Sequence, residues 1–128
     1  MTTIKSHTDI PQSKKLAKFL PRESADMCYR YYSGSMITGY GDCVLAKSYI
    51  TGKNVIREND LPCWSLAALL NILHSRAKDI PSLSGGGYKD GKYISDWCLD
   101  YEFENGDYQK TFADNPVDAC VAMIIKTS

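Results

Sequence analysis

The segment from Tyr93 to Glu104 restricts the fold more than any other, because apolar and polar residues alternate along most of it. A period of two places the two kinds of side chain on opposite faces of a β-strand. Asn105 and Gly106 follow at once, and this dipeptide is the strongest short-range signal for a β-hairpin. A two-residue turn there predicts three cross-strand pairs: Phe103 with Tyr108, Tyr101 with Lys110, and Leu99 with Phe112.

A second turn signal, Asp90-Gly91, lies just before this strand. A turn there places Tyr88 opposite Tyr93. Two hairpins that share one long strand predict a three-stranded meander.

Three segments have the end signals and the periodicity of helices. The first is 10–20, where Asp9 and Gln12 can form a capping box and Pro21 ends the helix. The second is 61–73, with Asp60 as its cap and apolar residues around nearly its whole circumference, which predicts a buried central helix. The third begins at Pro116 after the cap Asn115, and its buried face comprises Val117, Val121, Ile124 and Ile125.

Residues 22–56 have weaker signals. The segments 27–32 and 43–50 are rich in Tyr, Val and Ile and predict strands, while the glycine-rich segment 33–42 predicts a loop and 51–54 a turn. The expected fold class is therefore α+β in a single domain, residues 1–128. It consists of an antiparallel sheet of about four to six strands, including the meander, packed against three helices.

Charge and hydropathy exclude several classes of protein. Lys and Arg number 15 and Asp and Glu also 15, so the net charge is zero, which argues against a nucleic-acid or membrane-surface protein. The apolar run 66–70 is far too short to cross a bilayer, and the polar start of the sequence predicts no signal peptide. We expect a cytoplasmic protein.

The five cysteines predict core residues in a reducing compartment, because their number is odd and no pair has CxxC spacing. Neither histidine, His7 nor His74, has a second ligand at helical spacing, so the sequence predicts no metal site and no cofactor. Cys63 would lie in the first turn of the second helix, where a thiolate is favoured. Local geometry keeps His74 away from it, and His7 could approach only through the tertiary fold; a buried structural thiol is the favoured interpretation.

Two further sets of residues are candidate sites. The acidic face of the long strand, Asp96, Asp100, Glu102 and Glu104, could supply paired carboxylates, but a solvated face is favoured. Tyrosines are frequent, and three glycines precede a tyrosine in a segment that could present backbone N–H groups to an anion. The candidate residues for binding a ligand or partner are Tyr29, Arg30, Tyr31, Tyr32, Tyr40, Gly85, Gly86, Gly87 and Tyr88.

Three segments, QSKKLAKFLPRESADM at 12–27, LPCWSLAALLNIL at 61–73 and DNPVDACVAMI at 114–124, resemble a family of short proteins from gut Bacteroidales genomes, prophages and phages. The resemblance covers the three predicted helices and not the strands. It implies a small intracellular accessory protein of a mobile element. No activity, cofactor or site residue comes with it.

No nucleophile–base pair, metal cluster or phosphate loop stands out, so the sequence favours a non-catalytic module that binds a small molecule or a protein. One alternative is a small hydrolase or transferase that uses Cys63 or the acidic strand. Another is a homo-oligomeric structural protein with the tyrosine-rich strand as its interface.

Overall fold

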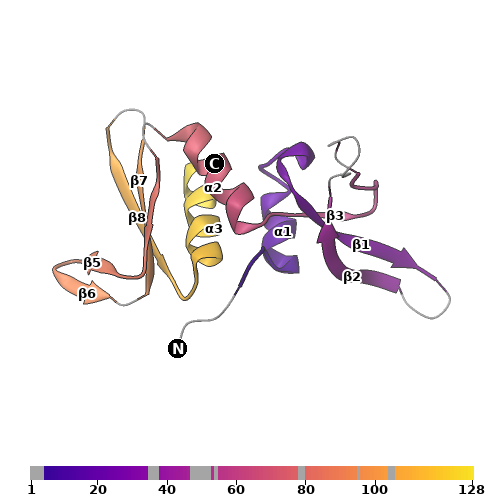
Figure 1. The fold of residues 1–128 in the computed structure, drawn as a ribbon, viewed down its shortest axis with the longest axis horizontal. Coiled ribbons are helices and arrows are strands. Elements are labelled where there is room, and N and C mark those ends of the chain that lie inside the picture. Colours follow the sequence, from indigo (N-terminus) through magenta and orange to yellow (C-terminus); the bar gives the residue numbers. More distant parts are fainter. Residues whose placement is uncertain are drawn as a thin grey trace. The chain divides into compact units, whose positions relative to one another are not determined.

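A computed structural model describes residues 5–34, 38–46, 53, 55–77, 80–94, 96–103 and 106–128. Within these ranges the chain forms three α-helices, a short 3-10 helix and eight strands in three antiparallel sheets, which confirms the α+β class (Figure 1). Contacts divide it into two compact units, His7–Ala68 and Leu69–Ser128 with Met1–Ser6. That the chain unfolds as a single domain stays a prediction. None of the described helices is both long and apolar enough to cross a membrane.

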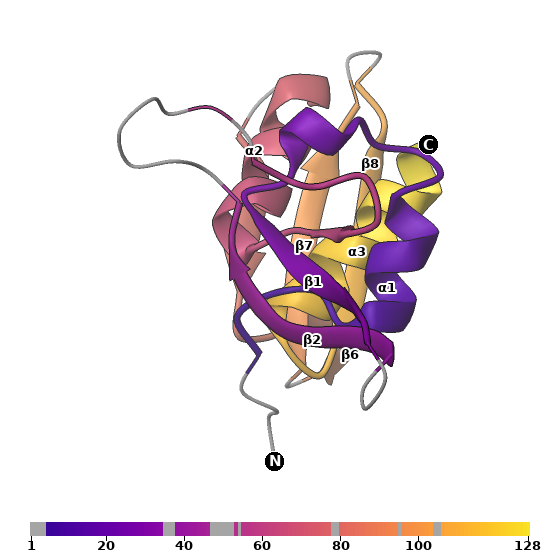
Figure 2. The ribbon, with the colours of Figure 1, turned by 90° about the vertical axis from the view of Figure 1, so that its right-hand side faces the viewer.

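The unit His7–Ala68 is built on a three-stranded sheet in the order β2-β1-β3. Its strands are β1 (Met27–Ser33), β2 (Thr38–Leu45) and β3 (Leu61–Cys63), and Figure 2 shows β1 and β2 side by side. Helix α1 (Ile10–Leu16) packs against β3, and the 3-10 helix η1 (Arg22–Ser24) leads into β1. The predicted capping box of α1 is present, but the helix ends before Leu20.

The loop predicted over 33–42 is wrong for most of its described part, because β2 begins at Thr38. Tyr31 pairs with Tyr40, and the register shifts by one between the pairs Tyr29–Cys43 and Tyr31–Tyr40, where β2 contains one more residue than β1. Gly39 has a φ of 135°, a value that favours glycine. The predicted strand residues 47–50 and the turn at 51–54, apart from Lys53, lie outside the described residues.

The second predicted helix is also corrected. Residues Leu61–Cys63 form β3, and helix α2 (Leu66–Arg76) begins after Ser65, whose hydroxyl accepts from Ala68 N–H at 3.2 Å. Backbone pairing of Pro62 with Cys28 extends the sheet where the sequence suggested a first helical turn. Only Leu69 and Leu73 of α2 are fully buried. The prediction of a helix buried around nearly its whole circumference is therefore wrong.

The unit containing Leu69–Ser128 holds two small sheets. One has the order β4-β7-β8 and the other pairs β5 with β6. Their strands are β4 (Ser82–Ser84), β5 (Gly87–Lys89), β6 (Lys92–Ile94), β7 (Trp97–Glu102) and β8 (Tyr108–Ala113). Helix α3 (Pro116–Thr127) packs on β7 and β8 and begins at the predicted cap Asn115, whose side chain accepts from Asp118 N–H (Figure 1).

The predicted meander is wrong because its long strand is two strands. Tyr88 does pair with Tyr93, but β6 ends at Ile94 and belongs with β5, while β4 takes the other edge of β7. The sheets have three, three and two strands among the described residues, smaller than the four to six expected.

The register of the β7–β8 hairpin differs from the prediction by one residue. Leu99 pairs with Thr111, and Phe112 pairs with Cys98. Phe103 N–H donates to Asp107 O, Gly106 N–H donates to Phe103 O, and Gly106 has a φ of 93°. This pattern is typical of a three-residue loop that ends in a left-handed glycine. The predicted turn had two residues, and the additional residue shifts the register by one.

Candidate metal centre

The sheet of the unit His7–Ala68 brings two cysteines to the same face. Cys43 on β2 pairs with Tyr29 of β1, and Cys63 at the end of β3 pairs with Met27 of the same strand. Residues two apart on a strand point to one face, and cross-strand partners share that face. The two thiols therefore meet above the central strand, and Cys43 Sγ lies 3.2 Å from Cys63 Sγ.

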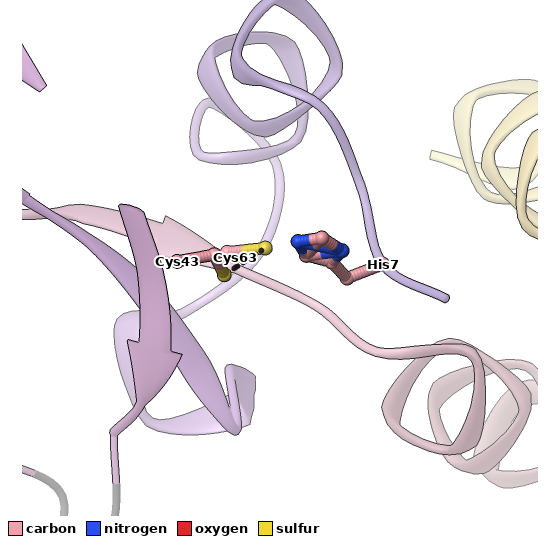
Figure 3. A group of neighbouring side chains, drawn as sticks. All are labelled: His7, Cys43 and Cys63. Carbon is pink, nitrogen blue, oxygen red and sulfur yellow. Dashed lines mark hydrogen bonds between the residues drawn. The ribbon is translucent and has the colours of Figure 1, made fainter. Parts of the chain in front are cut away.

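His7 reaches this pair from the segment before α1. It forms an isolated antiparallel bridge with Ser65, just beyond β3, and its ring stacks on that of Tyr29 with centroids 6.0 Å apart. One ligand atom each from His7, Cys43 and Cys63 lie within 4.8 Å of one another. Figure 3 shows the imidazole ring directed at the two sulfur atoms.

Thr8 fixes the position of His7 relative to Cys63. Its N–H donates to Trp64 O at 3.0 Å, and its hydroxyl accepts from Trp64 N–H at 3.1 Å. The Thr8 hydroxyl also lies 2.7 Å from the Ser13 hydroxyl and donates to Cys63 Sγ at 3.5 Å. Thr8 and Trp64 have no exposed surface, so this support is rigid and dry.

The two thiols differ in acidity. The hydrogen bond from Cys43 lowers the pKa of the Cys63 thiol, and this effect and those of Thr8 and Ser13 outweigh the opposing effect of burial. The same hydrogen bond, together with burial, raises the pKa of the Cys43 thiol. Cys63 is therefore the first of the pair to become a thiolate, the form that binds metals.

Burial raises the pKa of the Tyr29 hydroxyl, and the neighbouring thiols of Cys63 and Cys43 raise it further. The phenol therefore stays protonated and donates to Thr8 O at 2.7 Å. This bond and the stacked ring hold His7 on two sides. Such supporting contacts orient the ligands of protein metal sites.

Cys43 and Cys63 are free thiols, because their sulfur atoms lie 3.2 Å apart and a disulfide bond is only about 2.05 Å long. Cys43 and Cys63 lie on opposite sides of β1, and neighbouring strands are about 4.8 Å apart. A tetrahedral zinc ion holds its sulfur and nitrogen ligands about 3.5 Å apart, and the three ligand atoms here lie within 4.8 Å of one another.

The candidate tyrosines of this unit lie on β1 and β2. Tyr31 and Tyr40 pack edge to face at 5.6 Å, whereas Tyr32 is half exposed. Arg30 donates to the carboxylate of Asp60 at 2.9 Å, so its charge is already paired. Tyr31 lines a polar cavity of about 320 Å³ next to Asp60.

The other candidate residues, Gly85–Gly87 and Tyr88, lie in the second unit. A Cβ on Gly86 would come within 2.2 Å of the Tyr93 hydroxyl, and one on Gly87 within 3.1 Å of Cys98 Sγ. These two glycines allow close packing of the β5–β6 hairpin. Tyr88 is exposed and packs edge to face on Tyr93 at 5.5 Å.

Cys63 and the acidic strand β7 are the two candidate catalytic sites that the sequence suggests. Cys63 lies at the end of a strand and not in the first turn of a helix, so a helix dipole does not act on it as expected. On β7, Asp100 forms an ion pair with Lys110 at 3.5 Å. That carboxylate is therefore engaged across the strand pair.

The local spacing rules did not identify the cluster because its members come from three separate segments. The sequence indicates that His7 can approach Cys63 only through the tertiary fold, and the structure provides that approach. Cys43 had no signal beyond its place in a predicted strand. Comparison of the chain with protein-family models, curated proteins and solved structures gave no match.

Proposed function

We propose that this protein is a binding module whose ligand is a thiophilic transition-metal ion, with zinc as the first candidate. The observation that carries the proposal is the convergence of His7, Cys43 and Cys63 on one face of the sheet. Imidazole and thiolate are the ligands that zinc and copper(I) prefer. Three protein ligands leave a fourth position for water or an external group.

Burial favours an ion over an organic substrate at this place. Cys63 has no exposed surface, and Cys43 and His7 are half-buried. An enzyme nucleophile must come within bonding reach of a substrate atom, which the covered Cys63 sulfur does not allow in this conformation. An ion that enters between Cys43 and His7 needs far less space.

Cobalt(II) titration of the reduced protein without an affinity tag tests the proposal. Cobalt replaces zinc in thiolate sites and gives charge-transfer and tetrahedral ligand-field absorption bands. We expect these bands to saturate at one ion per chain and to disappear when zinc is added. Removing one ligand in His7→Ala, Cys43→Ala or Cys63→Ala should weaken binding by more than the roughly tenfold to hundredfold that loss of a supporting outer-shell contact costs.

Cys28→Ala and His74→Ala are the matched controls, because each removes the same chemical group elsewhere in the chain. Both should bind cobalt as the wild type does. Circular dichroism of every variant identifies those that fail to fold, and Cys43→Ala is the most informative because Cys43 is only half-buried. Absence of the bands in the wild type, or their persistence in folded Cys43→Ala, would show that the cluster is not a metal site.

An accessory role in a mobile element is the setting that the family resemblance suggests for such a module. The resemblance to proteins of Bacteroidales prophages and phages supports this part of the proposal. The genes next to the coding sequence test it. Phage structural or replication genes there are expected, whereas a setting of core metabolic genes would contradict it.

A further inference from the structure

A second cavity lies in the unit Leu69–Ser128. It measures about 390 Å³, within the usual range of small-molecule pockets, and is formed by residues of β5, β8 and α3. Phe112, Ala122 and Ile125 contribute apolar surface to it. Three lysines from the three different elements, Lys89, Lys110 and Lys126, complete the lining.

The positive charge of the lysines around this cavity is not fully paired with negative charge. Lys110 is paired with Asp100, but within the described residues no carboxylate lies at ion-pair distance from Lys89 or Lys126. Like charges that converge on one partly apolar cavity repel one another, and an anion between them removes that repulsion. The net charge of the whole chain is zero, so this concentration of positive charge is local.

We propose that the cavity binds a small organic anion with an apolar body, in which a carboxylate or phosphate group contacts Lys89 and Lys126. The apolar part then lies on Phe112 and Ile125. Charge complementarity supplies the orientation, and burial of apolar surface supplies much of the affinity. The proposal is independent of the metal centre, which is formed by the other unit.

Displacement of the fluorescent dye anilinonaphthalene sulfonate from the folded protein tests this site. Decanoate combines a carboxylate with an apolar chain and should displace the dye below its micelle-forming concentration. Decanol has a similar chain without the charge, and inorganic phosphate has the charge without the chain, so both should displace it much more weakly. Equal displacement by decanol and decanoate would overturn the proposal.

The double variant Lys89→Gln/Lys126→Gln should weaken decanoate binding by about tenfold, because two charge-assisted contacts are lost. Lys14→Gln/Lys15→Gln, which removes two exposed lysines from α1, is the charge-matched control and should bind decanoate like the wild type. NMR shifts on adding decanoate should centre on the amides of Thr111 and Ala122. Unchanged affinity in the first double variant, or shifts centred elsewhere, would refute the site.

Discussion

Asp60 precedes β3, and its buried carboxylate accepts hydrogen bonds from two backbone N–H groups and two arginine side chains. The N–H groups of Tyr31 and Arg57 donate at 2.9 and 3.0 Å, and the guanidinium groups of Arg30 and Arg57 donate at 2.9 and 3.2 Å. Burial alone would raise the pKa of this carboxyl, but the hydrogen bonds outweigh it and lower the pKa to about 2. The residue predicted to cap a helix instead connects β1 to the segment before β3.

This acidity makes stability depend on pH in a defined direction. The folded-state pKa of Asp60 is about 2 and its ordinary value is 3.8, so the folded state favours the carboxylate. The contribution is fully present above about pH 4 and is lost as the pH falls toward 2; it amounts to about 2 kcal/mol. Asp60→Asn should lose that free energy at neutral pH and flatten the acid limb of the unfolding curve.

Urea unfolding at several pH values measures both effects. Asp42→Asn removes an exposed carboxylate from the same unit and should change the free energy of unfolding by less than about 0.5 kcal/mol. An acid limb of unchanged slope in Asp60→Asn would contradict the role assigned to this carboxylate.

The turn of the β7–β8 hairpin depends on the conformation of one residue. Gly106 has a φ of 93°, which an L side chain rarely adopts, so Gly106→Ala should destabilise the protein by about 1–2 kcal/mol. Gly85→Ala is a suitable comparison, because a Cβ there meets nothing within 4 Å. Thermal unfolding should show a clear loss for the first variant and little for the second; equal losses would contradict the turn geometry.

The elements differ in how well the sequence predicts them. Asp9 and Asn115 cap their helices as predicted, because a cap depends only on neighbours in the chain. Tertiary pairing makes Leu61–Cys63 a strand beside β1, whereas the local turn at Gly106 sets a hairpin register that the Asn-Gly signal does not predict. The candidate site follows the same division, since Cys63 had a local signal but its meeting with His7 depends on the sheet.

Metal binding should stabilise the folded state of the whole chain against unfolding. An ion that binds the native protein far more tightly than the unfolded chain adds up to about 2.7 kcal/mol when its free concentration is a hundred times the Kd. Zinc should therefore raise the melting temperature of the wild type and leave that of Cys43→Ala unchanged. The increase should shrink as the pH falls, because protons compete for the ligands. Equal shifts in both proteins would contradict binding at the cluster.

The two tryptophans can show whether the chain unfolds as one domain, because Trp64 lies in one unit and Trp97 in the other. Trp97→Phe leaves Trp64 as the only reporter, and Trp64→Phe leaves Trp97. For a single domain, fluorescence and circular dichroism should give coincident transitions within each variant, with or without zinc. Separate transitions would show that the two units unfold independently.

The placement of the three ligands also affects the unfolded chain. An ion held by His7, Cys43 and Cys63 closes two loops, and the longer one, from His7 to Cys43, contains α1 and β1. Closing a loop removes conformational entropy from the unfolded chain, and a metal clip over a long loop removes more than one over a short loop. Metal present during refolding should therefore increase the rate at which the sheet β2-β1-β3 forms.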